Sequence, residues 1–143
     1  MKTLKTIILG LVILMSFGAA NAKSINPPKE KISVNYAVTT YLNAIAHGKN
    51  SGLSEVMDSN VKFTMVRGKS MLTYNKDQVL EIFKGSENIE QDCETTVSTS
   101  ESAPDLTVAK VEMKYKEFTR INYLTLANTV DGWKITSIYS VFK

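Results

Sequence analysis

The sequence of 143 residues contains a single cysteine, Cys93, and a single histidine, His47. One cysteine cannot form an intramolecular disulfide, so packing must hold the fold together even in an oxidising compartment. One histidine excludes the two-histidine zinc motifs and argues against a metal site built mainly from His and Cys. We therefore expect no metal and no cofactor. The simpler interpretations are a favourable charge at a helix C-terminus for His47 and a small buried hydrophobe for Cys93.

Two further catalytic motifs are incomplete in this sequence. Residues 68–70 read Gly-Lys-Ser, like the tail of a phosphate-binding loop, but the leading glycine of that loop would fall at Phe63, inside a predicted strand. Residues 52–56 lack the second glycine of a serine nucleophile elbow. Lysine and arginine are scattered rather than clustered, although the net charge is +3. We therefore expect no nucleic-acid partner.

Long apolar runs are missing except at the N-terminus. Residues 1–22 combine Lys2 and Lys5, an apolar stretch over 7–17 and small residues that end at Ala22, which is the order of a secretory signal peptide. The apolar stretch is shorter than the roughly 20 residues of a membrane-spanning helix. We predict cleavage after Ala22 and export to the periplasm or the cell exterior, with no membrane attachment afterwards; an uncleaved anchor is the alternative.

The remaining chain reads as one domain. Residues 23–31, with two adjacent prolines, predict an extended leader, and residues 32–143 have the length of a single domain with its own core. Removal of Lys2 and Lys5 leaves the basic and acidic residues nearly balanced.

The hydrophobic periodicity predicts helices early in the domain and strands late. The predicted elements are a helix over 32–46 ended by Gly48, a helical turn after Ser51, strands over 61–65 and 70–74, a helix from the cap Asn75 to Gly85, and strands over 89–101, 106–116, 118–128 and 133–142. This order predicts an α+β fold, with N-terminal helices packed on one face of a curved, mostly antiparallel sheet.

Three short phrases carry a resemblance to a known superfamily. Residues 41–45 read Tyr-Leu-Asn-Ala-Ile, residues 118–124 read Phe-Thr-Arg-Ile-Asn-Tyr-Leu, and residues 131–135 read Asp-Gly-Trp-Lys-Ile. With the element order, they make residues 33–143 resemble the cone-shaped nuclear transport factor 2-like domains, closest to small exported bacterial proteins labelled "putative lumazine-binding". The resemblance implies a cone with a pocket. Asn122 departs from the pattern, because related sequences often carry an acid there, and any role of that acid is not carried over.

Two strand faces are candidates for the pocket wall. One face presents Phe118, Arg120, Asn122, Leu124 and Leu126, and the other presents Trp133, Ile135, Ser137, Tyr139 and Val141. Both faces are apolar with a few polar interruptions, which is typical of a small-molecule site. We predict Arg120, Asn122 and Tyr139 as polar ligand-binding residues, with Phe63 and Met113 as wall. The alternative is that Arg120 and Asn122 lie at a rim or satisfy neighbouring backbone groups.

The acidic residues give no catalytic candidate. Glu90, Asp92 and Glu94 alternate along one side of a predicted strand, and burying three like charges together would cost several kcal/mol. We therefore predict that they face water.

The opposite sides of the last strands predict an interface. Ile121, Tyr123 and Thr125, with Ile138 on the neighbouring strand, are expected to leave apolar surface where no helix covers the sheet. Such a surface indicates a homodimer formed by back-to-back sheets.

Three functions are compatible with these observations. The first is an exported, non-catalytic domain that binds a small, partly apolar molecule. The second is an isomerase or dehydratase with an acid or base in the pocket, and the third is a structural or partner-binding dimer with no ligand. The pocket favours the first function, because no residue type that would carry the second is placed inside the predicted cone.

Overall fold

Three helices and six strands make up residues 30–143, the part of the chain that the computed structural model describes. They are α1 (Val34–His47), α2 (Leu53–Val56), β1 (Met57–Arg67), β2 (Ser70–Tyr74), α3 (Lys76–Lys84), β3 (Glu94–Ser102), β4 (Leu106–Lys114), β5 (Thr119–Thr129) and β6 (Gly132–Phe142). The predicted signal peptide, 1–22, lies outside the described residues, as does all but the end of the predicted leader, 23–31. No helix within residues 30–143 is long and apolar enough to span a membrane.

Local capping chemistry fixes the ends of the two longer helices. The Ser33 side chain accepts a hydrogen bond from the Tyr36 backbone N–H at 3.1 Å at the start of α1, and Gly48 ends that helix with a left-handed φ of 63°. At α3, Asn75 and Gln78 form a reciprocal capping box. The predicted helix boundaries at Gly48 and Asn75 are therefore confirmed.

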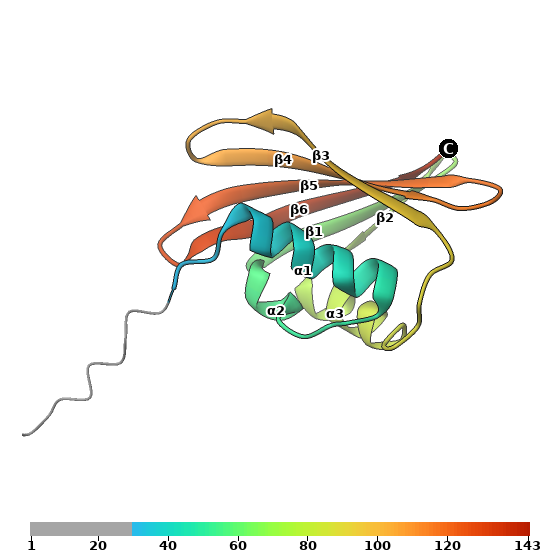
Figure 1. The fold of residues 1–143 in the computed structure, drawn as a ribbon, viewed down its shortest axis with the longest axis horizontal. Coiled ribbons are helices and arrows are strands. Elements are labelled where there is room, and N and C mark those ends of the chain that lie inside the picture. The colour runs from blue at the N-terminus through green and yellow to red at the C-terminus, as the bar shows by residue number, and fades with distance from the viewer. Residues whose placement is uncertain (1–29) are drawn as a thin grey trace, which may run out of the picture.

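The strands form one sheet in the order β2-β1-β6-β5-β4-β3. β1 and β6 are parallel, and every other neighbouring pair is antiparallel. All three helices lie on one face of this sheet (Figure 1). The predicted α+β architecture is confirmed, with the parallel pairing of β1 and β6 joining the early and late strands.

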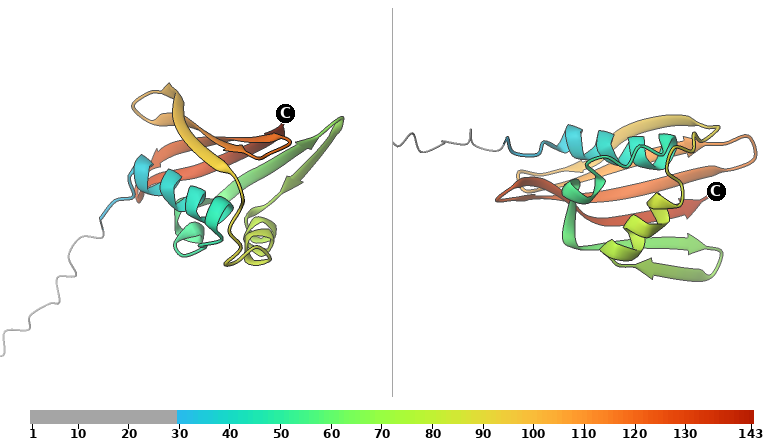
Figure 2. Two further views of the ribbon diagram at one scale, coloured as in Figure 1. Left: turned by 45° about the vertical axis from the view of Figure 1, so that its right-hand side comes forward. Right: turned by 90° about the horizontal axis from the view of Figure 1, so that it is seen from below.

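The core fills the space between the helices and the concave face of the sheet. Figure 2 shows that the sheet curves, with its β1–β2 edge and its β3–β4 edge diverging. The Tyr41 ring of α1 packs edge-on against the Phe83 ring of α3 at a centroid distance of 5.8 Å. Large side chains that are fully buried with Tyr41 include Phe63, Met113, Leu124, Leu126, Ile135 and Ile138. Together these side chains fill the closed part of the cone.

A β-bulge in β6 changes which side chains face the core. Leu124 pairs with Ile138, but Leu126 pairs with Ile135, so β6 uses one residue more than β5 between these pairs. The extra residue, Thr136, donates its hydroxyl to the Thr125 carbonyl at 3.2 Å. Side chains of β6 after Thr136 therefore point to the opposite face of the sheet from the one that a regular strand would give them.

The bulge corrects two predictions about strand faces. Ile138, predicted to face outward, is fully buried in the core, while Tyr139, predicted to line the pocket, is 43% exposed on the outer face beside Tyr123. The simple alternation from Trp133 onward fails at the bulge because a single inserted residue reverses every later side chain.

The chain before β3 forms a loop rather than the predicted strand start at residue 89. The Asn88 and Gln91 backbone N–H groups donate to the carbonyls of Gly48 at 2.9 Å and of Ala46 at 2.8 Å, which ties the loop to the end of α1. A Cβ at Gly48 would lie 2.5 Å from the Ser86 carbonyl oxygen, so only glycine allows this approach. The loop therefore lies beside the end of α1 that faces the open end of the cone.

The Asp131-Gly132-Trp133 turn anchors the start of the domain. Ile32 forms a parallel bridge with Gly132, and the Trp133 N–H donates to the Ile32 carbonyl at 2.8 Å. Gly132 has φ of 101°, and an added Cβ would collide with the Ile32 backbone. The residues 131–135, which carry part of the family resemblance, therefore hold the start of the domain against the last hairpin.

Candidate functional site

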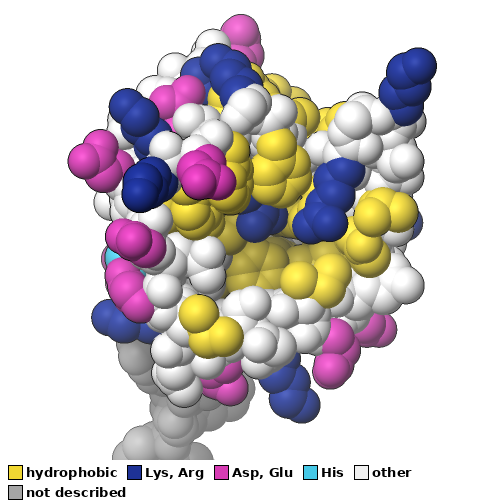
Figure 3. Space-filling view, turned by 90° about the vertical axis from the view of Figure 1, so that its right-hand side faces the viewer, with side chains coloured by type: hydrophobic (Ala, Val, Ile, Leu, Met, Phe, Trp, Pro, Cys, Tyr) yellow, Lys and Arg dark blue, Asp and Glu magenta, His cyan; other side chains and the backbone are white. Residues whose placement is uncertain are grey.

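A cavity of about 200 Å³ opens at the end of the cone where α1 and α3 terminate. Its lining comes from five separate segments of the chain. The lining residues are Ala44, Ile45, Phe63, Ile82, Phe83, Ser86, Gln91 and Arg120. Figure 3 looks onto this end of the molecule and shows a hollow among hydrophobic side chains with basic side chains in and beside it.

Arg120 is the only charged residue among the side chains that line this cavity in the described part of the chain. It points to the concave side of β5, where its Nε donates to the Ser140 hydroxyl of β6 at 2.7 Å. Its guanidinium carbon lies 5.6 Å from the centre of the Phe142 ring, within the range of a cation–π contact. The hydrogen bond and the ring hold the guanidinium at the mouth of the cavity.

The positive charge of Arg120 acts on two phenols, the buried Tyr41 and the partly buried Tyr115. Burial raises the pKa of Tyr41 well above its usual value, and the nearby Arg120 charge opposes that rise. Burial also raises the pKa of Tyr115, again against the Arg120 charge. Within residues 30–143, no carboxylate lies within ion-pair distance of Arg120. The cavity mouth therefore carries an uncompensated positive charge.

Asn122 lies deeper, below the cavity, and has no exposed surface. Its Oδ1 accepts from the Tyr41 hydroxyl at 3.3 Å, and its Nδ2 lies 3.4 Å from the Val111 carbonyl and 3.7 Å from the Met113 sulfur. Both ends of the amide are engaged by protein groups. Asn122 thus forms the polar floor of the cone rather than part of the cavity surface, as the alternative interpretation anticipated.

The other predicted site residues are divided between cavity, core and outer surface. Phe63 lines the cavity together with Arg120. Met113 is fully buried and reaches only the Asn122 floor. Tyr139 lies on the convex side of the sheet, because of the bulge at Thr136. The structure therefore brings together two of the five predicted residues.

A small polar cluster borders the cavity at Gln91. The Tyr115 hydroxyl donates to Gln91 Oε1 at 3.0 Å. Partial burial raises the pKa of the Cys93 thiol, with nearby Asp92 and Glu90 acting in the same direction and a hydrogen bond with Tyr115 opposing it. The thiol is thus kept protonated, which suits the structural interpretation of Cys93.

Sequence reasoning missed most of the cavity wall. Ile82 and Phe83 lie in the predicted helix from Asn75 to Gly85, and Gln91 lies in the predicted strand over 89–101, which in the structure begins only at Glu94. Adjacent helical residues are about 100° apart, so Ile82 lies at the border of the apolar stripe, where it is 42% exposed, while Phe83 is buried.

The acidic residues behave as predicted. Glu90, Asp92 and Glu94 are exposed, and none of them lines the cavity. Glu90 pairs with His47, the last residue of α1, with Nδ1 and Oε1 2.6 Å apart. Within residues 30–143, no group of three or more His, Cys, Asp or Glu side chains is arranged to hold a metal ion.

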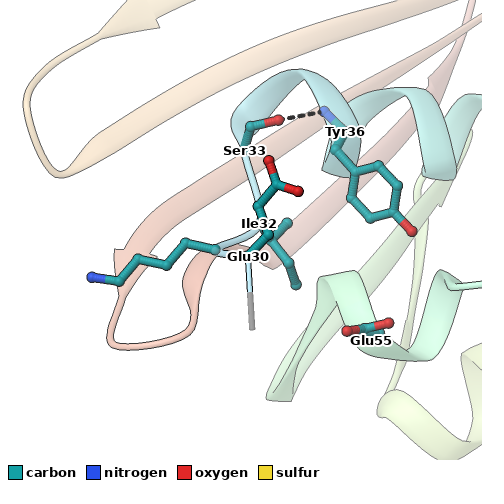
Figure 4. Close-up of a pocket in the computed structure, with 6 residues that line it drawn as sticks. Glu30, Ile32, Ser33, Tyr36 and Glu55 are labelled. Atoms are coloured by element: carbon teal, nitrogen blue, oxygen red, sulfur yellow. Dashed lines mark hydrogen bonds between the residues drawn. The ribbon is translucent and has the colours of Figure 1, made fainter. Parts of the chain in front are cut away.

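A second hollow, of about 310 Å³, lies at the start of the described chain. Figure 4 shows Ser33 and Tyr36 of the α1 N-terminus above Glu55 of α2. Ser33 is used as the helix cap and Ile32 is bridged to Gly132. The residues around this hollow therefore position the entering chain and the helix.

The fold is the nuclear transport factor 2-like fold. The chain superposes on a nuclear transport factor 2-like protein of unknown function from Silicibacter pomeroyi with a TM-score of 0.61 and 18% identity, covering 76% of this chain and 90% of that one. It also superposes on a putative ketosteroid isomerase from Parabacteroides distasonis (TM-score 0.55, 13% identity, 74% and 84% covered). At these identities the likeness shows the fold alone.

A family model gives a more specific assignment than the fold does. The family model described as "Putative lumazine-binding" matches residues 29–140, and the chain belongs to that family. No curated protein matches the sequence significantly. The resemblance drawn from residues 41–45, 118–124 and 131–135 is therefore confirmed for superfamily and family.

Proposed function

We propose that this protein is an exported, non-catalytic domain that holds a small, partly apolar molecule in the cavity at the open end of its cone. The observation that carries the proposal is a hollow of mixed character, which is walled by Ile45, Phe63 and Phe83 but owes most of its exposed surface to polar atoms, with Arg120 as its one charged lining residue. Apolar walls that hold a ligand and polar groups that orient it are the two components of a small-molecule site. A volume of about 200 Å³ corresponds to roughly seven water molecules, so the ligand is small.

The absence of an acid from this wall supports binding over acid–base catalysis. An isomerase or dehydratase needs a carboxylate or another base within reach of its substrate. Among the described residues, the cavity lining includes no Asp or Glu. The floor position carries Asn122, which has no acidic proton to transfer.

Native mass spectrometry of protein purified from its own compartment tests the binding proposal. We expect a mass excess that disappears on denaturation, together with a chain mass that begins after Ala22. The matched control is the same protein refolded after complete removal of small molecules. A protein that carries no extra mass, and that gains none when returned to an extract of its compartment, would contradict the proposal and favour the structural alternative.

We further propose that the protein is a homodimer formed by the convex face of the sheet. Tyr123 and Tyr139 are directly opposite each other on β5 and β6, and they are 36% and 43% exposed. Aromatic side chains that are half-exposed on a face without helices are typical of an interface. The Lys110–Glu112 ion pair at 2.7 Å lies beside them on β4 and provides a polar rim.

Light scattering at micromolar concentration tests the dimer. We expect a dimer for the native protein and a monomer for Tyr139→Glu, because the new carboxylate would be buried without a partner. Tyr36→Glu is the matched control, since Tyr36 is 49% exposed on the helical side and should leave the dimer intact. A native protein that is monomeric under these conditions would rule out this assembly.

A further inference from the structure

The sequence contains only two arginines, Arg67 and Arg120, and both lie over the same ring. Their guanidinium carbons are 5.9 Å and 5.6 Å from the centre of Phe142. Arg67 comes from the end of β1 and Arg120 from the start of β5, so the sheet order brings them to the same end of the cone. A shallow hollow lined by Arg67, Phe118 and Phe142 adjoins the Arg120 cavity there.

The two arginines bring positive charge to one end of the cone. Each guanidinium carbon is within 6 Å of the same ring centre, although salt screens much of the repulsion between exposed charges that are farther apart than about 8 Å. Within residues 30–143, neither arginine has a carboxylate partner at ion-pair distance. The native fold therefore places two cations without a carboxylate counter-ion at this end of the molecule.

Arg120 has its terminal nitrogens available for a ligand. Its Nε donates to Ser140, and neither terminal nitrogen donates a hydrogen bond to another of the described residues. This leaves one planar, two-pronged edge, which matches the two oxygens of a carboxylate. The Ser140 bond fixes the direction of the edge, so the arginine is preorganised rather than free to rotate.

The surroundings favour a monoanion over a phosphate. Phosphate sites use helix N-termini or loops of backbone N–H groups. The cavity instead receives the C-terminal turns of α1, at Ala44 and Ile45, and of α3, at Ile82 and Phe83. The dipole at a helix C-terminus is negative, so one guanidinium balances a single negative charge here but not two.

We propose that the ligand is a small monocarboxylate, with its anionic group on the terminal nitrogens of Arg120 and its apolar body against Ile45, Phe63 and Phe83. This inference rests on the proposed binding function and names the chemical class of the ligand. Arg67 lies outside the cavity wall and contributes to the positive potential of the opening. Its role is to attract the anion rather than to hold it.

Calorimetric titration of the purified protein with matched pairs of probes tests the inference. Benzoate and hexanoate are compared with benzamide and hexanamide, which have the same shape and no charge. We expect each carboxylate to bind on the order of 10- to 100-fold more tightly than its amide. The Arg120→Met variant should lose this preference, while Arg120→Lys, which keeps the charge but not the two-pronged edge, should keep part of it.

Arg67→Gln is the matched control, because it removes the same charge from the same end of the molecule. We expect it to weaken carboxylate binding only a few-fold, mainly at low salt. Equal losses in the Arg67 and Arg120 variants would overturn the inference, since the effect would then be general electrostatics.

The other outcomes distinguish the binding of a small molecule from the preference for a carboxylate. If amides bind as tightly as carboxylates, the cavity is a binding site but the anion assignment is wrong. If none of the four probes binds at concentrations up to about 10 mM, the carboxylate inference is overturned, and native mass spectrometry decides separately whether the cavity holds another small molecule. The comparison of probes in the native protein decides the question even if Arg120→Met does not fold.

Discussion

Replacing Asn122 by aspartate places an acid at the floor of the cone. Similar sequences often carry an acid at this position, and this chain does not. The amide Nδ2 now lies 3.4 Å from the Val111 carbonyl and 3.7 Å from the Met113 sulfur, and Oδ1 accepts from Tyr41 at 3.3 Å. An ionised carboxylate would keep the Tyr41 bond but would oppose the Val111 oxygen with a second acceptor. The substitution exchanges a satisfied amide for a buried charge with one donor.

The cost follows from burial. Fully buried acids have pKa values raised by roughly 3 to 5, and the Arg120 charge, which already opposes the raised pKa of Tyr41, limits the increase here. A rise of about 2.5 above the unfolded value of about 3.9 gives a folded pKa near 6.4, and each pKa unit corresponds to about 1.4 kcal/mol. We expect a loss of about 3 kcal/mol in the free energy of unfolding above that pKa.

The sign of the pH dependence is fixed by the direction of the shift. Because the folded pKa of the new acid lies above its unfolded value, the loss is small below about pH 4 and grows as the pH rises through the folded pKa. At low pH the protonated acid can donate to the Val111 carbonyl, as the Asn122 amide does. Destabilisation of this variant is therefore a feature of neutral and alkaline pH.

Urea unfolding of Asn122→Asp at about pH 4.5 and about pH 8.5 measures the effect against the native protein. Asn128→Asp is the matched control, since Asn128 is exposed on the same strand and should change stability by less than about 0.5 kcal/mol. A variant that is as stable as the native protein at the higher pH would refute the reasoning, because it would mean that water reaches the Asn122 floor.

Two further substitutions test the parts of the fold that surround the site. Gly132→Ala should lower the free energy of unfolding by about 2 to 4 kcal/mol, because the added methyl collides with the Ile32 backbone at φ of 101°. Gly68→Ala is the control, at φ of 59° with no atom within 4 Å of the new methyl, and should cost only about 1 kcal/mol. Thermal denaturation measures both variants, and an equal loss of stability in Gly132→Ala and Gly68→Ala would contradict this account. Tyr41→Phe should cost about 1 to 2 kcal/mol in the same measurement, because it leaves the buried Asn122 Oδ1 without its donor; no loss would mean that water replaces the hydroxyl.

The helices of this fold could be predicted from the sequence because their boundaries depend on neighbouring residues. Asn75 and Gln78 form a capping box within four residues, and Gly48 adopts the left-handed conformation that ends α1. These signals require no knowledge of the rest of the chain. The parallel pairing of β1 with β6 could not be predicted in this way, because it joins segments far apart in the sequence.

The strand faces of β6 show where alternation stops being informative. Ile135 and Ile138 belong to the same core cluster although they are three residues apart, whereas residues at this spacing on a regular strand point to opposite faces. That spacing is the local trace of the bulge at Thr136. It was not recognised because Trp133, Ile135, Tyr139 and Val141 make an apparently regular apolar series.

The candidate site could be predicted only in part. Arg120 and Phe63 follow from strand alternation, which is local. Ser86 and Gln91 reach the cavity because the loop after α3 is tied to the end of α1 through the Gly48 and Ala46 carbonyls. Contacts of this kind depend on the folded backbone, and no periodicity in the sequence encodes them.

The polar groups of the cone are arranged differently at its floor and at its mouth, and the difference bears on what the site can do. At the floor, Asn122 and Tyr41 bond to each other, and Asn122 also bonds to the Val111 backbone, so both groups are engaged within the core. At the mouth, the terminal nitrogens of Arg120 make no hydrogen bond with residues 30–143. Catalysis by general acids and bases needs a group that gains and loses a proton near neutral pH, whereas a guanidinium stays protonated. Among the described lining residues, the one charged group is therefore a guanidinium, which suits the proposed binding of an anion.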